Sequence, residues 1–168
     1  PLQKSTFYTV FGHHEREIGI ASYLRINPSV GSIEVGWISM SPLMQRTVMS
    51  AEAMYLMMSH VFDDLGYRPL EWKCDSLNAP SRATAQRLGF RFEGIFCKCT
   101  HYKGRNRDTA WFAVIDTDWP TLKVRFTAYL GPKNFDAHGQ QLGVCQIFAS
   151  QHSTDAYHKK LRSIAHQT

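Results

Sequence analysis

Two segments of the sequence combine residue types that could bind an anion or move a proton. Residues 41–54, SPLMQRTVMSAEAM, follow a strand-like run and open a helical pattern, which is where a phosphate-binding loop commonly lies. The segment contains no glycine, so it is either a binding loop whose glycines have been replaced or only a connection. Farther on, in LNAPSRATAQRLGFRFEG (77–94), Asn78 stands at the start of a second helix and Ser81 lies one turn into it.

The elements before and within the first segment follow from residue periodicity. Residues 6–11 and 18–26 are rich in β-forming residues and flank the polar turn GHHERE, which predicts an antiparallel hairpin with His13 and His14 exposed in its turn. Alternation in 32–39 predicts a strand with one apolar face: Ile33, Val35 and Trp37. The helix that follows has an apolar stripe expected in the core: Met54, Met57, Met58, Val61, Phe62 and Leu65.

The rest of the chain continues the alternation of strands and helices. A strand over 70–74 precedes the helix that Gly89 ends, and a hairpin with the basic tip KGRNRD joins strands over 91–102 and 109–116. A last helix, with Asp118 as a candidate N-cap, ends at Gly131. Because strands 32–39 and 70–75 are each followed by a helix, we expect them to be parallel. Their carboxyl ends then form a mouth that two helix N-termini face.

Composition narrows the classes of protein. The chain has 168 residues, a formal net charge of +5 and 43% hydrophobic residues, which predicts one globular domain that suits an anionic small ligand or an acidic partner. No Lys/Arg run resembles a nucleic-acid-binding tail, and no stretch is long enough for a membrane helix, so neither partner is expected. The four cysteines form no CxxC pair, which favours free thiols in a reducing compartment. We expect a cytoplasmic protein that is a monomer or a homodimer.

Together these segments resemble the GNAT superfamily of acyl-CoA N-acyltransferases, specifically its RimJ/RimL-like branch of ribosomal-protein N-terminal acetyltransferases. The matching stretches are IEVGWISMSPLMQRTVMSAEAM, YRPLEWKCDSLNAPSRATAQRLGFRFEG and KGRNRDTAWFAVID. The resemblance implies an α/β (mixed α+β) fold: a central mixed, mostly antiparallel sheet, two parallel strands splayed at the CoA site, and helices on both faces. It also implies that the first strand and two helices of the family are missing before residue 7.

The resemblance assigns the loop to the pyrophosphate of CoA, which the family binds through backbone amides with a Q/R-x-x-G-x-G/A pattern. Gln45 and Arg46 match its opening, Val48 replaces its first glycine, and Ser50 occupies the small-residue position. No metal is implied. The residues expected to bind acetyl-CoA are Ile38, Met40, Gln45, Arg46, Thr47, Val48, Met49, Ser50, Asn78, Ser81 and Arg82.

Acyl transfer from a thioester to an amine requires a deprotonated amine, a polarised carbonyl and a stabilised thiolate. Asn78 would hydrogen-bond the pantetheine arm or a water near the thioester, or it only caps its helix. Ser81 would donate a proton to the departing sulfur, or it is an ordinary first-turn polar residue. Glu34 and Glu93 are candidate bases that act through water, although each could be a plain surface glutamate, and Tyr102 is a further candidate acid.

The sequence therefore predicts a GNAT acetyltransferase domain over 1–135 and a polar, flexible tail over 136–168. The predicted function is an acetyl-CoA-dependent N-acetyltransferase in which an amine, either a protein N-terminus or a small amine, attacks the thioester directly in a ternary complex. The alternative is a non-catalytic CoA-binding or interaction module with the same fold. A basic nucleic-acid-binding protein is a distant third, and it would show steeply salt-dependent binding.

Overall fold

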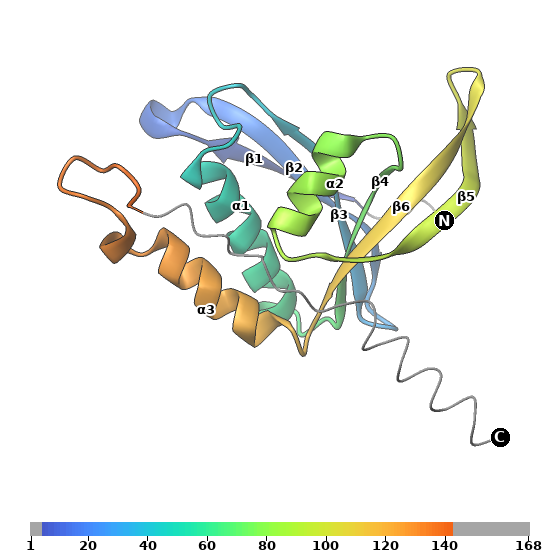
Figure 1. Cartoon of the computed structure of the whole chain (residues 1–168). Coiled ribbons are helices and arrows are strands. Elements are labelled where there is room, and N and C mark those ends of the chain that lie inside the picture. Colours follow the sequence, from blue (N-terminus) through green and yellow to red (C-terminus); the bar gives the residue numbers. More distant parts are fainter. Residues whose placement is uncertain (1–4, 143–168) are drawn as a thin grey trace.

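The computed structural model describes residues 5–142, which form a single mixed sheet with three α-helices (Figure 1). The strands are β1 Thr6–Phe11, β2 Glu17–Asn27, β3 Ser32–Met40, β4 Pro69–Asp75, β5 Arg91–Tyr102 and β6 Arg105–Ile115. The helices are α1 Val48–Ser59, continued by a π-helical turn at His60–Asp64, then α2 Ala79–Arg87 and α3 Trp119–Leu130. The strand order is β1-β2-β3-β4-β6-β5, and only the β3–β4 pair is parallel. The predicted fold class and the predicted parallel pair are confirmed.

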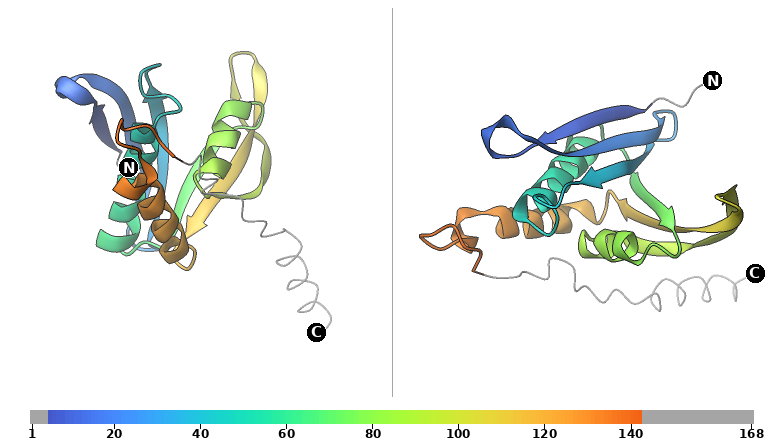
Figure 2. Two further views of the ribbon diagram at one scale, coloured as in Figure 1. Left: turned by 60° about the vertical axis from the view of Figure 1, so that its left-hand side comes forward. Right: turned by 90° about the horizontal axis from the view of Figure 1, so that it is seen from above.

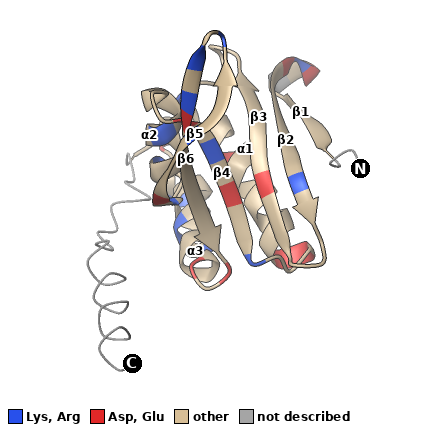
Figure 3. Ribbon diagram, turned by 90° about the vertical axis from the view of Figure 1, so that its right-hand side faces the viewer, with Lys and Arg blue, Asp and Glu red and all other residues tan. Residues whose placement is uncertain are grey.

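All three described α-helices pack on the same face of the sheet (Figure 2). No described helix covers the opposite face, whose central strands carry charged residues (Figure 3). The expectation of helices on both faces is therefore corrected for the described part of the chain. The reason lies in strand alternation, because β4 turns Leu70, Trp72 and Cys74 towards the helices and its charged residues away from them. No helix among the described residues is long and apolar enough to cross a membrane.

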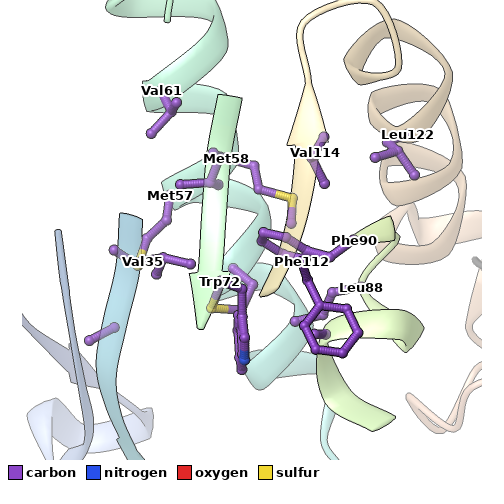
Figure 4. Packing of buried hydrophobic residues seen from close by; sticks show 14 of the residues in the cluster. Val35, Met57, Met58, Val61, Trp72, Leu88, Phe90, Phe112, Val114 and Leu122 are labelled. Carbon is purple, nitrogen blue, oxygen red and sulfur yellow. The ribbon is translucent and has the colours of Figure 1, made fainter. Parts of the chain in front are cut away.

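The core forms where the apolar stripe of α1 meets β3, β4 and β6 (Figure 4). Met54, Met57 and Met58 are buried there, as the periodicity predicts. The prediction that Leu65 lies in the core is wrong, because it follows the end of the helix and 40% of its surface is exposed. Gly66 follows with φ of 63°, the left-handed conformation that ends the helical segment. This packing fixes the start of α1 relative to the ends of β3 and β4.

Strand β3 contains a bulge that the sequence pattern did not predict. Ser22 of β2 pairs with Gly36 and Ile20 pairs with Ser39, so Ala21 faces two residues of β3. Trp37 lies in this bulge with φ of 49°, and 71% of its surface is exposed. The expectation that Trp37 shares the buried face of Ile33 and Val35 is wrong, because the extra residue reverses the alternation.

Two further expectations concern the C-terminal part. Asp118 precedes α3 but makes no side-chain capping bond; its carboxylate instead pairs with Arg91 at 3.0 Å. Residues 136–142 form a turn closed by a bridge between Phe135 and Gln141. The remainder of the predicted tail, 143–168, lies outside the described residues.

We expect Met58→Ala to lower the free energy of unfolding by about 2–5 kcal/mol, because it removes a fully buried side chain and leaves a cavity. Leu56→Ala on the same helix is the matched control, since 59% of Leu56 is exposed and its loss should cost about 0.5 kcal/mol or less. Urea unfolding of both variants measures the difference. Equal costs for the two substitutions would contradict the described packing of α1.

Candidate functional site

The candidate site is an opening between β3 and β4. These strands pair only at Ile33↔Leu70, Glu34↔Glu71 and Val35↔Trp72. Beyond that point β3 stays with β2 through its bulge, and Lys73, Cys74 and Asp75 stay with β6. The facing backbone groups of the diverging ends are therefore free to bond an extended ligand inserted between the strands.

The loop after β3 brings unused backbone amides to one side of this opening. Turn hydrogen bonds within 41–50 occupy the amides of Met44, Gln45, Thr47 and Ser50. The amides of Arg46, Val48 and Met49 have no acceptor among the described residues. They lie at the N-terminus of α1, where the helix dipole also favours an anion.

The polar side chains of this loop maintain its shape. Gln45 Nε2 donates to the Met40 carbonyl at 2.8 Å, Thr47 Oγ1 donates to the Met44 carbonyl, and Ser50 Oγ donates to the Thr47 carbonyl. Ser50 is buried, and the preceding strand residues Ile38 and Met40 pack against the core. The loop therefore offers an anion its backbone amides and the exposed side chain of Arg46.

The start of α2 lies at the other side of the opening, directly after β4. Asn78 Oδ1 accepts a hydrogen bond from the Ser81 amide at 3.1 Å, so Asn78 is the N-cap of the helix. The Trp72 indole donates to Ser81 Oγ at 3.0 Å. Since Ser81 Oγ accepts this bond, its own proton remains available to a further acceptor. Arg82 is held at the end of the β4–α2 connection by a bond from Nη1 to the Ser76 carbonyl.

Glu34 lies on the open face of the sheet, below the point where the strands part. Only 4% of its surface is exposed, and its carboxylate pairs with Arg25 and with Lys73, the latter at 3.0 Å. Lys73 also pairs with Glu71 and lies over the Trp111 ring, 3.8 Å from its centroid. Glu34 is thus a buried, doubly ion-paired group rather than a surface glutamate.

Glu93 lies away from the opening. It is exposed on β5, the outermost strand, and β6 separates it from β4. Tyr102, near the far end of the same strand, reaches the opening because its hydroxyl donates to Asp75 Oδ2 at 3.1 Å. The fold therefore brings the candidate acid Tyr102 closer to the end of β4 than the candidate base Glu93.

Asp75 and Arg105 form a connection that sequence analysis missed. Asp75 is the last residue of β4, and its carboxylate accepts from the Leu77 amide, Arg105 and Tyr102. The Leu77 amide and then the Arg105 guanidinium hold the pKa of Asp75 below its usual value. The position of Asp75 at the carboxyl end of a strand could have marked it as a candidate site residue. Its partner Arg105 lies about 30 residues away in the chain, so the sequence pattern did not reveal the ion pair.

A further cavity among the described residues lies elsewhere. A cavity of about 470 Å³ separates β1 and β2 from α1, with Tyr8, Phe11, Tyr23 and Leu56 in its walls. Of the candidate ligand-binding residues only Met49 lines it. No group of three or more metal-ligating side chains occurs in residues 5–142.

The arrangement fits a ligand with a diphosphate at one end and an extended amide arm. The free amides at α1 suit the diphosphate, and the unpaired ends of β3 and β4 suit the arm. Val48, which replaces a glycine of the family pattern, has the right-handed backbone of a first helical residue and so needs no glycine for its conformation. The left-handed residue of the loop is Arg46, with φ of 61°.

We expect Asp75→Asn to destabilise the protein at pH 7 and to have little effect in strong acid. The folded pKa of Asp75 is depressed, so its contribution is complete above the ordinary Asp pKa of about 4 and is lost as the pH falls through the folded value. Urea midpoints from pH 7 to pH 2 measure the difference, with Glu52→Gln, an exposed residue of α1, as control. A pH-independent difference would contradict the ion-pair role.

The chain is similar to several acetyltransferases. A family model described as an acetyltransferase (GNAT) domain matches residues 2–91. A GCN5-related N-acetyltransferase from Brucella melitensis is 48% identical, covers 83% of this chain and 64% of its own, and superposes with a TM-score of 0.80. The uncharacterized N-acetyltransferase YnaD of Bacillus subtilis is 24% identical over 67% of this chain and 56% of its own length.

A more distant structure shares the fold. The spermidine/spermine N-acetyltransferase SpeG from Vibrio cholerae is 17% identical over 69% of this chain and 68% of its own, with a TM-score of 0.61. This chain spans less than two thirds of the length of the Brucella and Bacillus relatives. Because the family model covers more than half of the chain, and the mostly antiparallel sheet with one parallel pair is as the family resemblance implies, the chain belongs to the GNAT acetyltransferase family.

Proposed function

We propose that this protein is an acetyl-CoA-dependent N-acetyltransferase in which an amine attacks the thioester directly in a ternary complex. The single observation that supports this most is the parting of β3 and β4 between two helix N-termini. One side of the opening offers free amides for a diphosphate, and the other offers the hydroxyl of Ser81. Bound acetyl-CoA would supply an activated acetyl group as a thioester.

Ser81 is the proposed proton donor to sulfur. As the amine nitrogen bonds to the carbonyl carbon, the carbon–sulfur bond breaks and the leaving thiolate needs a proton. The Trp72 indole fixes Ser81 Oγ through the acceptor side of the hydroxyl, so the proton is directed away from Trp72. Asn78 would contribute its side-chain NH₂ to the amide arm, since its oxygen is already bonded to the helix.

The amine must lose a proton, and Glu34 remains our proposed base in preference to Glu93. Glu34 lies on the open face three residues before Trp37 of the bulge, whereas Glu93 lies on the outermost strand. A Cβ at Gly36 would lie 2.6 Å from Leu24 Cδ1 and 3.6 Å from Glu34 Oε1, so the glycine makes room for the Leu24 side chain beside this carboxylate. Its ion pairs with Arg25 and Lys73 mean that a water would have to carry the proton.

The finer assignments belong to the same proposal. We assign the chain to the RimJ/RimL-like branch on the segments QRTVMS and NAPSRATAQRLGF, with a protein N-terminus or a small amine as acceptor. A cytoplasmic location is proposed on the sparse, unpaired cysteine pattern, and a monomer or a homodimer is proposed as the oligomeric state. A non-catalytic CoA-binding module is the second candidate, and the replacement of a family glycine by Val48 favours it.

Calorimetric titration of acetyl-CoA tests the proposed binding site. We expect Val48→Glu to weaken binding by about tenfold or more, because a carboxylate beside the free amides would repel the diphosphate. The helix dipole stabilises a negative side chain in the first turn, so we expect Val48→Glu to fold like the unaltered chain. Leu56→Glu adds the same charge at an exposed site of the same helix and should bind as the unaltered chain does. Equal affinity for all three proteins would refute the site.

Ser81→Ala should lower kcat by about 10²-fold or more while the Kd for acetyl-CoA changes little, since a general acid acts mainly in the transition state. Thr84→Ala is the control, because Thr84 lies one turn along α2, is half-buried, and its hydroxyl donates only to the Pro80 carbonyl among the described residues. Rates are measured with an alanine-terminated peptide and with spermidine as acceptors. Unchanged kcat in Ser81→Ala would remove Ser81 from the mechanism. Tight acetyl-CoA binding with no turnover on any amine would favour the non-catalytic module.

A further inference from the structure

The β5–β6 hairpin places a cluster of cations at the rim of the opening. Strand β6 runs past the end of β4, since Asp75 pairs with Thr109 and the Ser76 amide donates to the Asp108 carbonyl. The residues of β6 that precede Thr109, from Arg105 to Asp108, therefore project past the last residue of β4. Arg107 is two residues farther out on the same, open face of the sheet.

Tyr102 holds the cations of this hairpin together. The charged groups of Lys103, Arg105 and Arg107 lie 5.9, 5.3 and 5.7 Å from the centroid of its ring. An aromatic face attracts each of them, but it does not neutralise their charge. The cluster is therefore preorganised around a ring that is itself bonded to Asp75.

Only one of these cations has an acidic partner in the described part of the chain. Arg105 pairs with Asp75, while Asp108 accepts a bond from the Lys98 amide. Arg107 has no ion pair among residues 5–142, and its Nε is buried without a hydrogen-bond partner. A half-buried guanidinium with an unused donor is costly unless an anion occupies the site.

The position of Arg107 relates it to the second substrate. If the CoA arm lies between the ends of β3 and β4 with its diphosphate at α1, the amine approaches the thioester from the open face, because the described helices cover the other face of the sheet. Arg107, Tyr102 and Arg105 border that approach at the end of β4. An acceptor that carries a negative group beside its amine could form an ion pair with Arg107.

We propose that Arg107 binds a carboxylate of the acceptor, so that the protein acetylates amines that bear a negative charge, such as acidic amino-terminal residues, in preference to polyamines. This inference rests on the proposed N-acetyltransferase function. The Arg fork matches a carboxylate in two parallel hydrogen bonds, which a neutral amide of the same shape cannot accept equally well. A cationic polyamine would instead meet repulsion from Lys103, Arg105 and Arg107.

The test uses two peptides that differ only in an amino-terminal Glu or Gln, together with spermidine. With the unaltered chain, kcat/KM for the Glu peptide should exceed that for the Gln peptide by about tenfold or more. Arg107→Met should abolish this preference by lowering the Glu rate about 10- to 100-fold while it leaves the Gln rate nearly unchanged. Arg107→Lys should keep part of the preference. Arg16→Met removes the same charge from the β1–β2 connection, at the opposite edge of the sheet, and should change neither rate.

Several results would overturn the inference. A higher kcat/KM for spermidine or for the Gln peptide than for the Glu peptide would overturn it. An equal loss of rate on both peptides in Arg107→Met would also overturn it. Either result would leave the acetyltransferase function intact. If no acceptor turns over, the proposed function fails, and the peptides are titrated calorimetrically into the chain with CoA. Tighter binding of the Glu peptide that Arg107→Met removes would still support the anion site, and equal binding of both peptides would refute it.

Discussion

The site depends on the short length of the β3–β4 pairing. The bulge at Trp37 lets the end of β3 follow β2, while the end of β4 follows β6, so the two parallel strands separate after Val35 and Trp72. Separation exposes backbone donors and acceptors that a continuous sheet would consume. Because each strand is followed by a helix, the same separation places two helix N-termini on either side of the opening.

The two faces of the sheet are stabilised differently. Burial of apolar side chains holds α1, α2 and α3 on one face. The open face instead carries Glu34 between Arg25 and Lys73, and ion pairs there offset the cost of burying a carboxylate. The same face carries the link between Asp75 and Arg105, which fixes the β5–β6 hairpin at the end of β4. Ion-paired side chains therefore line the open face, from which a second substrate would approach.

The loop without glycine is compatible with a binding role for a conformational reason. Glycine is needed where φ is positive or where a ligand approaches the backbone closely. At Val48 the backbone is helical, so only close approach is affected. The positive φ falls on Arg46, which accepts the left-handed conformation at a cost of about 1–3 kcal/mol. Such strain is maintained by the turn bonds from Met44, Gln45 and Thr47.

The sequence by itself determined the order of strands and helices, the parallel pair, the apolar stripe of α1 and the cap at Asn78, because periodicity and capping are local properties. It did not determine the bulge at Trp37, the packing of all three described helices on one face, or the position of Glu34 between Arg25 and Lys73. The sequence also did not predict the contacts of Asp75 with Tyr102 and Arg105. These features depend on which strands become neighbours, and only the tertiary structure decided that, since side chains distant in sequence interact only after the sheet has assembled.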